Sequence, residues 1–122
     1  MGGFRPERIA VRIHEELSKM MIRDVKDPRV TPISITRVEI AKDLKRAVIQ
    51  YLPLGGGEVS AELREGLRDV AGKLRGPVGR ALGIRHSPEL VFEVDTHTEQ
   101  AIRVSSLIDS FRSREVVAVG EE

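Results

Sequence analysis

The segment of residues 33–54 constrains the fold more than any other part of the chain, because it alternates apolar and polar side chains in two stretches. It reads ISITRVEIAKDLKRAVIQYLPL, and AKDLK separates the two stretches. Isoleucine, valine and threonine, which are abundant here, favour a pleated strand. The pattern therefore predicts two strands joined by a short basic connection that holds Lys42, Lys45 and Arg46.

The first of these strands changes phase along its length. Ile33 and Ile35 share one phase, whereas Val38 and Ile40 share the other. Side chains in a strand alternate between its two faces. Either a bulge therefore shifts the register near Arg37, or both faces of this strand are partly covered.

Apolar side chains recur every three or four residues before and after this pair of strands. Residues 6–25 predict an amphipathic helix, and the proline at its start is tolerated in a first helical turn. A second helix is expected to begin at a cap, Ser60, and a third helix to fill about the ten residues after Gly72. The tight turn between them is expected at Val70, Ala71 and Gly72, where glycine allows the backbone to bend.

A third strand and a last helix follow. Leu90, Phe92 and Val94 alternate with other side chains, which predicts the strand. Thr96 and Glu99 form a capping-box pattern for the helix. The apolar positions of this helix are Ala101, Val104, Ile108 and Phe111.

The predicted order is helix, strand, strand, helix, helix, strand and a C-terminal helix. This order indicates the α+β class, with a three-stranded sheet packed on helices. A chain of 122 residues without an internal repeat predicts one domain with one core. We place the domain at residues 5–113 and expect flexible termini at 1–4 and 114–122, which are short and lack apolar periodicity.

Composition excludes several classes of protein. No apolar run approaches the roughly 18 to 20 residues that span a bilayer. The start, MGGFRPER, lacks the apolar stretch of a secretory signal. The absence of cysteine removes disulfides, thiolate chemistry and cysteine-ligated zinc. We therefore expect a cytoplasmic protein with no membrane partner.

Catalytic and metal-binding patterns are weak. Asp95, His97 and Glu99 come nearest to a metal or acid–base cluster, but they straddle a strand end and a capping box, so a structural role explains them. The sequence contains neither a P-loop nor a nucleophile elbow. We expect a protein that is not an enzyme and needs no cofactor or metal.

The formal net charge of +1 hides a separation of charge along the chain. Residues 73–86, KLRGPVGRALGIRH, hold four positive side chains, a histidine and no acid, whereas residues 87–100 hold four acids and no lysine or arginine. Such a basic run neutralises phosphates and favours RNA binding, although a solvated helix face is the alternative. The expected RNA contacts are Lys73, Arg75, Arg80, Arg85 and His86, followed by a second set of Arg8, Arg12, Lys42, Lys45 and Arg46.

Aromatic side chains are few: one tyrosine, three phenylalanines and no tryptophan. They cannot hold a row of unstacked bases, and Tyr51 and Phe92 are expected in the core. Recognition of RNA backbone and shape is therefore predicted.

Two helices joined by a tight turn beside a three-stranded sheet resemble a type II KH domain, in which a GXXG loop clamps single-stranded RNA. GPVG at residues 76–79 matches that loop. Only about one helical turn remains between this match and Gly83, whereas the clamp needs a helix behind it. We therefore interpret the match as coincidental.

The chain also resembles the ribosome-binding factor A family, which is similar to KH domains. The matching pieces occur in order along nearly the whole chain: RPERIAVRIHEEL, DPR, ITRVEIAKDLKRAVIQY, AGKLRGPVGRALGIRHSPEL and FEVD. In that family an Ala-X-Gly kink stands in for the GXXG loop. The corresponding residues here are Val70, Ala71 and Gly72, so a larger, β-branched side chain stands where the family has alanine.

The resemblance implies a non-enzymatic factor that binds the small (30S) ribosomal subunit. Such a factor assists late maturation of precursor 16S rRNA, including its 5′ end, especially in the cold, alongside ribosome-associated GTPases that promote its release. We expect a monomer. Two alternatives stay open: a general KH-type RNA binder that engages unrelated single strands, and a protein-interaction adaptor whose binding persists in high salt.

Overall fold

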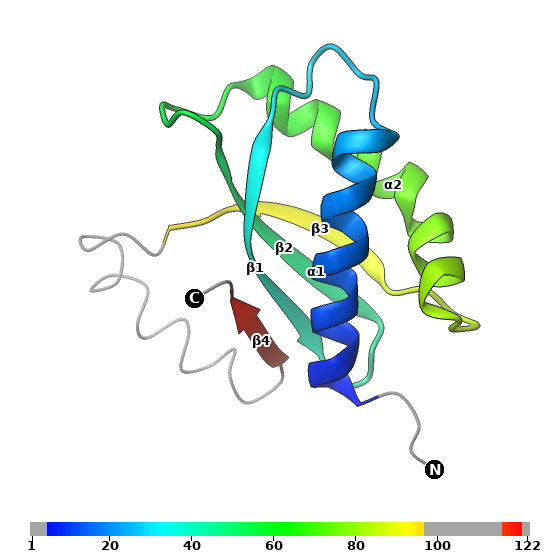
Figure 1. Ribbon diagram of the computed structural model, residues 1–122. Helices are drawn as coiled ribbons and strands as arrows, with labels where there is room; N and C mark the ends of the chain where they lie inside the picture. The colour runs from blue at the N-terminus through cyan, green and yellow to red at the C-terminus, as the bar shows by residue number, and fades with distance from the viewer. Residues whose placement is uncertain (1–4, 97–115, 121–122) are drawn as a thin grey trace.

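The computed structural model describes residues 5–96 and the strand at residues 116–120. Its elements, in chain order, are α1 (Pro6–Arg23), β1 (Ile33–Ala41), β2 (Arg46–Pro53), α2 (Ala61–Leu82), β3 (Glu89–Val94) and β4 (Val116–Gly120). Figure 1 shows α1 and α2 packed with the sheet. The predicted α+β, KH-like fold class is confirmed.

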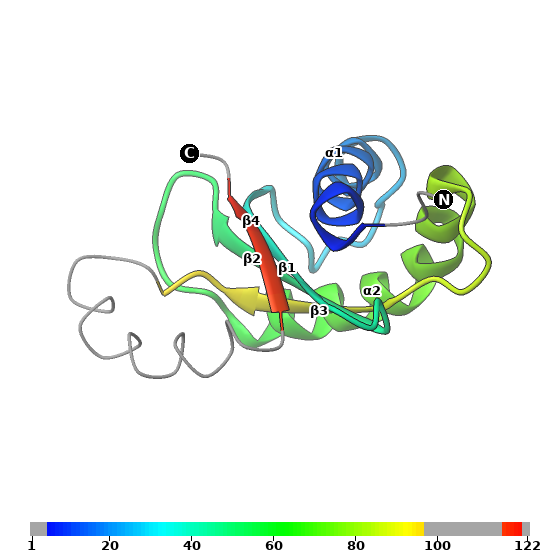
Figure 2. The same cartoon turned by 90° about the horizontal axis from the view of Figure 1, so that it is seen from below.

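The strands form one mixed sheet in the order β3-β2-β1-β4. β1 and β2 are an antiparallel pair, and β4 pairs antiparallel with the other side of β1. β3 pairs parallel with β2, from Arg46 opposite Glu89 to Tyr51 opposite Val94. Parallel neighbours need a long crossover, and here the crossover contains α2, which packs along β3 (Figures 1 and 2).

The hydrophobic core lies between the two helices and the sheet. Its completely buried large side chains are Ile13, Leu17, Val38, Ile40, Ile49 and Val78. Burial of each contributes roughly 1.5–3 kcal/mol relative to exposure. Tyr51 and Phe92 pack against the core as expected, with ring centroids 6.0 Å apart and planes at 75°.

The change of phase in β1 is a bulge. The register with β2 shifts between Ile35 and Arg37, so Thr36 is the extra residue. Ile35 and Val38 are consequently both buried in the same core, although they differ in phase along the chain. The first of the two sequence-based alternatives is confirmed.

The first helix and the cap of the second agree with the predictions. α1 ends at Arg23, two residues before the expected end. Its buried face is formed by the residues at helical spacing, including Ile9, Ile13 and Leu17. At the start of α2, the Leu63 amide donates a hydrogen bond of 3.0 Å to the hydroxyl oxygen of Ser60.

α2 is one helix over residues where two were predicted. It continues through Gly72, Gly76 and Pro77 and ends at Leu82, and its C-cap is Gly83, whose φ of 71° is left-handed. Neither Gly72 nor Gly76 has a positive φ, so each costs about 1 kcal/mol of helix propensity without ending the helix. GPVG at 76–79 is therefore helical and forms no loop.

The axis of α2 changes direction between its two halves in Figure 1. A proline inside a helix removes one backbone donor and is a common cause of bending, and α2 contains Pro77. The kink at Val70, Ala71 and Gly72 stays a prediction.

Close packing fixes the chain that leaves α2. A Cβ atom added at Gly79 would lie 2.7 Å from the Cβ of Ser87, so the segment before β3 lies directly on this glycine. Arg75 on the preceding turn of α2 donates from Nε to the carbonyl oxygen of Ser87 at 3.1 Å. These contacts hold the start of β3 against α2.

The C-terminal part of the chain differs from the prediction. Residues 114–122 were expected to be a flexible terminus, but β4 pairs residues 116–120 with β1, from Arg37 opposite Gly120 to Ala41 opposite Val116. Its sequence, VVAVG, is rich in β-branched valine, and an edge strand needs only one neighbour. The helix expected after Thr96 lies outside the described residues.

Candidate nucleic-acid interface

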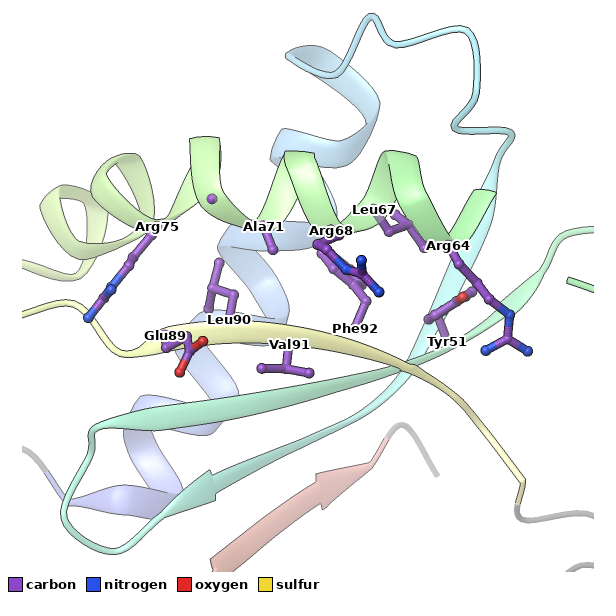
Figure 3. A pocket seen from close by; sticks show the side chains of 11 residues that line it. Tyr51, Arg64, Leu67, Arg68, Ala71, Arg75, Glu89, Leu90, Val91 and Phe92 are labelled. Carbon is purple, nitrogen blue, oxygen red and sulfur yellow. The ribbon is translucent and has the colours of Figure 1, made fainter. Parts of the chain in front are cut away.

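A groove separates the N-terminal two thirds of α2 from β3 (Figure 3). It has a volume of about 510 Å³, and we call it the α2–β3 groove. Its lining residues are Tyr51, Arg64, Leu67, Arg68, Ala71, Gly72, Arg75, Glu89, Leu90, Val91 and Phe92. Leu90 and Phe92 point from β3 toward the helix, so the floor is apolar (Figure 3).

Three arginines from α2 line this groove. Arg64, Arg68 and Arg75 are spaced four and seven residues apart, which places them on one face of the helix. All three are exposed, and none forms an ion pair with another residue in the described part of the chain. Burial raises the pKa of the nearby Tyr51 hydroxyl, and the positive charge of Arg64 opposes this shift.

A second depression continues the groove toward the C-terminal end of α2. The two share Gly72 and Arg75, and the second has a volume of about 440 Å³. Its lining residues are Gly72, Arg75, Gly76, Gly79, Arg80, Ile84, Arg85, His86 and Ser87. The structure therefore brings together four predicted contacts, Arg75, Arg80, Arg85 and His86, along one continuous surface.

The combined surface is strongly basic. Its lining includes five arginines and one histidine but a single acid, Glu89. Gly72 and Gly76 leave helix backbone exposed beneath the arginines. A phosphate chain laid along this surface would approach the helix closely while its charge is neutralised.

Arg29 forms ion pairs with two acids of α2 on the flank opposite the groove. Its guanidinium lies 2.7 Å from Asp69 and 3.9 Å from Glu65, both on α2, and 2.6 Å from Asp27 on the preceding loop. The hydrogen bonds that Asp27 accepts from the side chain and the backbone amide of Arg29 lower the pKa of Asp27 to about 2. The carboxylates are thus held on the flank of α2 that faces residues 24–30, and the arginines line the other flank.

Lys73 is not part of the basic surface. It lines a separate depression with residues 24–29. The acid-free run at residues 73–86 therefore contributes to two different faces of α2, because successive helical residues point about 100° apart.

The second set of predicted contacts surrounds one end of the molecule. Arg12 donates to the carbonyl oxygen of Ala81 at 3.1 Å and so joins α1 to the end of α2. Arg8 lies one turn earlier on α1 and is exposed. Arg12 thus has a structural contact, whereas Arg8 forms no ion pair within residues 5–96.

The connection between β1 and β2 lies beside the start of β3. The Glu89 amide donates to the carbonyl oxygen of Lys45 at 2.9 Å, and Arg46 is the strand partner of Glu89. Lys42, Lys45 and Arg46 are exposed. They consequently lie near the end of the groove that Arg85 and His86 occupy.

The predicted kink residues face different surroundings. Val70 and Ala71 are buried, whereas Gly72 is exposed and lines both depressions of the basic surface. No atom lies within 4 Å of the position that a Cβ on Gly72 would take. Bare backbone is therefore accessible midway along the surface.

Sequence reasoning missed Arg64 and Arg68. They precede the acid-free run, and Glu65 and Asp69 follow them directly in the sequence, so the local charge is balanced. A helical projection would have separated the arginines from these acids, since Arg64, Arg68 and Arg75 share a face. The signal that could have identified them is the helical spacing between Arg64, Arg68 and Arg75, which continues across the turn predicted at residues 70–72.

The sequence model that describes ribosome-binding factor A matches residues 5–108. The chain belongs to the ribosome-binding factor A family. A member from Caldanaerobacter subterraneus subsp. tengcongensis is 34% identical over 113 residues, which is 92% of this chain and 93% of that protein. Members from Desulfitobacterium hafniense and Acetivibrio thermocellus are 31% and 38% identical, over 99% and 86% of this chain and 97% and 86% of their own lengths.

Other kinds of site find no support in the described residues. Over residues 5–96, no group of three or more histidine, cysteine or acidic side chains could hold a metal ion. Neither α1 nor α2 is long and apolar enough to cross a bilayer. Of the weak Asp95, His97 and Glu99 pattern, only Asp95 lies within the described part.

Proposed function

We propose that this member of the ribosome-binding factor A family binds the small ribosomal subunit and assists late maturation of 16S rRNA, including its 5′ end. It acts in the cytoplasm as a monomer, without catalysis, with a role at low temperature and a functional link to ribosome-associated GTPases. The observation that carries the proposal is the continuous basic surface formed by the α2–β3 groove and its extension, in a chain of this family.

The surface suits a sugar–phosphate backbone better than a row of bases. Arg64, Arg68 and Arg75 supply charge along one wall, while Tyr51 and Phe92 are packed against each other. Each phosphate that an arginine neutralises releases condensed counterions, which makes affinity dependent on salt. We therefore propose recognition of RNA shape and backbone, with little sequence preference.

Additional basic residues extend the contact beyond the groove. Lys42, Lys45 and Arg46 lie near its end, and Arg8 lies on the exposed side of α1. A folded rRNA that follows the groove would meet these side chains next. An extended, shape-dependent contact of this kind favours the ribosomal subunit over an isolated single strand.

Co-sedimentation with purified ribosomal subunits across a salt series tests the proposal. We expect binding to free small subunits but not to large subunits, and we expect the double variant Arg64→Glu, Arg68→Glu to bind at least about tenfold more weakly. The slope of log affinity against log salt should become shallower by roughly 1.4–1.8 for two lost phosphate contacts. Circular dichroism checks that the variant is folded.

The matched control is Lys19→Glu, Arg23→Glu, which makes the same change of net charge on exposed positions of α1, away from the groove. If both variants bind the small subunit equally weakly, net charge alone explains the loss, and the groove is not the RNA-binding surface. Equal binding of unrelated single-stranded RNA would favour a general RNA binder. Binding that persists at high salt would favour a protein-interaction adaptor.

A further inference from the structure

The sheet has a free edge that faces the α2–β3 groove. In the strand order β3-β2-β1-β4, β3 has a neighbouring strand on one side only. Figure 3 shows β2 on one side of β3 and α2 on the other, with α2 and β3 running alongside each other. The groove therefore lies between a helix and the unpaired edge of a strand.

Main-chain groups of alternate residues point out from this edge. The amides of Glu89 and Asp95 both donate hydrogen bonds toward β2, of 2.9 and 2.8 Å. Successive residues of a strand direct their N–H and C=O groups to opposite sides. Leu90, Phe92 and Val94 consequently direct these groups away from β2 and toward the free edge.

Two of these three residues are accessible. Leu90 is only 5% exposed, whereas Phe92 and Val94 are partly exposed. Within residues 5–96, no other segment forms a hydrogen bond with the outward main-chain groups of Phe92 and Val94. Each of the two residues presents a donor beside an acceptor, which is the pattern that a further strand pairs with.

The helix side of the groove supplies charge and apolar surface for the side chains of such a strand. Leu67 and Phe92 belong to the apolar lining, and Arg64 and Arg68 lie beside them (Figure 3). Neither arginine forms an ion pair in the part of the chain that the structure describes. Residues four apart in a helix are about 6 Å apart along its axis, and alternate residues of a strand are roughly 6.4–6.8 Å apart. Acidic side chains at alternate positions of the added strand therefore match the two arginines.

The other face of β3 determines what stands between these acids. Leu90 and Phe92 point toward α2 (Figure 3), so Glu89 and Glu93 lie on the face that is turned away from it. Like charges directly opposite each other in neighbouring strands are destabilising. The residues between the acids of the added strand are therefore expected to be neutral or basic.

We propose that an extended segment of a protein partner, with acidic side chains at alternate positions, adds to the free edge of β3 as a further strand. A peptide strand supplies a donor and an acceptor at every second residue, in the spacing of this edge. Phosphates supply acceptors only, so they leave the carbonyl oxygens of Phe92 and Val94 without a donor. Bases that supply both groups find no free aromatic ring to stack on, because Tyr51 and Phe92 are packed against each other.

The added strand and an RNA backbone would use the same two arginines. The segment therefore competes with RNA for the α2–β3 groove. This competition rests on the proposed function, whereas strand addition itself does not.

Fluorescence anisotropy with the full-length protein and a labelled eight-residue peptide tests the assignment. The peptide alternates glutamate with threonine, which favours extended backbone, and is acetylated and amidated at its ends. Two further peptides carry N-methyl groups on the amides of either the glutamates or the threonines, which removes the donors along one edge and leaves the charge unchanged. We expect one methylated peptide to bind at least about tenfold more weakly and the other to bind like the parent.

The methylated peptide that fails also reports the direction of the added strand. In an antiparallel pair, the residue that bonds with Phe92 shares its face, which is the face of the glutamates. In a parallel pair, the bonding residues are those on the opposite face, which are the threonines. Loss of binding on methylating the glutamates therefore indicates antiparallel addition.

Amide hydrogen exchange followed by NMR gives a second readout. The amides of Phe92 and Val94 should exchange at least about tenfold more slowly when the parent peptide is bound. The amide of Val91, which already points toward β2, is the internal control. Absence of binding, equal binding of all three peptides, or unchanged exchange at Phe92 and Val94 would overturn the assignment. Oligouridylate that protects these amides when the peptide does not would make the edge a site for RNA bases and would also overturn it.

Variants separate the arginines of the groove from net charge. Arg64→Glu, Arg68→Glu should bind the parent peptide about tenfold more weakly, whereas Lys19→Glu, Arg23→Glu should bind it like the unmodified protein. Equal weakening in both variants would contradict the match between the acids and the groove.

The failure of this assignment is distinguishable from the failure of the proposed function. Peptide binding is measured without ribosomes, so it can fail while co-sedimentation with the small subunit still depends on Arg64 and Arg68. The reverse result would retain strand addition and remove the RNA contact. For the competition, an excess of the parent peptide should reduce co-sedimentation, and the methylated peptide that fails to bind should not. Co-sedimentation that the parent peptide leaves unchanged would refute the competition.

Discussion

Replacing Gly79 by alanine is expected to destabilise the protein, although alanine is the better helix former. The added Cβ would lie 2.7 Å from the Cβ of Ser87 and 3.2 Å from its hydroxyl oxygen. Ser87 cannot move away freely, because its carbonyl oxygen accepts a hydrogen bond from Arg75 and the next residue, Pro88, is buried. The clash must therefore be relieved by moving backbone.

The magnitude follows from two opposing terms. Alanine gains about 1 kcal/mol of helix propensity over glycine, whereas overpacking of a close contact costs typically about 1–3 kcal/mol. The contact at Gly79 is short, so we place the steric cost near 2 kcal/mol and the net loss near 1 kcal/mol. This loss corresponds to a melting temperature lower by roughly 2–6 °C.

Gly72→Ala is the matched control, since it lies in the same helix and no atom lies within 4 Å of the added Cβ. It keeps the propensity gain and omits the clash, so it should raise the free energy of unfolding by up to about 1 kcal/mol. Urea unfolding followed by circular dichroism measures both variants. A Gly79→Ala protein as stable as Gly72→Ala would refute the steric argument.

Three further outcomes are expected. Ser60→Ala removes the acceptor of the Leu63 amide and should lower the free energy of unfolding by about 1 kcal/mol in urea unfolding, while Ser60→Asp should preserve it; an unchanged alanine variant would contradict the cap. The pKa of Asp27 is lowered to about 2 by its hydrogen bonds with Arg29, so its stabilising effect should be present above about pH 4 and be lost as the pH falls toward 2. Acid unfolding of Arg29→Met should lack this component, and identical acid curves would argue against the ion pair. The pKa of Tyr51 is raised by burial, so spectrophotometric titration should show its phenol ionising above pH 10, and titration at or below that pH would contradict its packing.

Local patterns were sufficient to predict much of the fold. Alternation and β-branched residues located β1, β2 and β3, and the phase change between Ile35 and Val38 allowed a bulge to be anticipated. Helical spacing located α1, and Ser60 located the start of α2. Each of these features is determined by residues that are close together in the sequence, so a single sequence was sufficient to predict it.

Predictions failed where distant parts of the chain decide the outcome. Glycine and proline between residues 72 and 77 favour a break, but packing of Val78 and Leu82 on the core keeps α2 helical across them. β4 depends on the free edge of β1, more than 70 residues earlier in the chain. Neither effect is visible in a local window.

The candidate site was predicted in part for the same reason. Arg75, Arg80, Arg85 and His86 form one surface, as the basic run indicated. Arg64 and Arg68 were missed because linear charge counting averages them with the acids that Arg29 binds. Lys73 was included because the same counting ignores the direction in which helical residues point.

The parallel pairing of β2 and β3 has a consequence for synthesis of the protein. One wall of the α2–β3 groove is made by residues 89–92, which emerge from the ribosome after both helices and the first two strands. A nascent chain that ends after α2 contains Arg64, Arg68 and Arg75 but lacks the β3 wall of the groove. The groove is therefore complete only after residues 89–92 have been synthesised, so the proposed RNA contact cannot form on a shorter nascent chain.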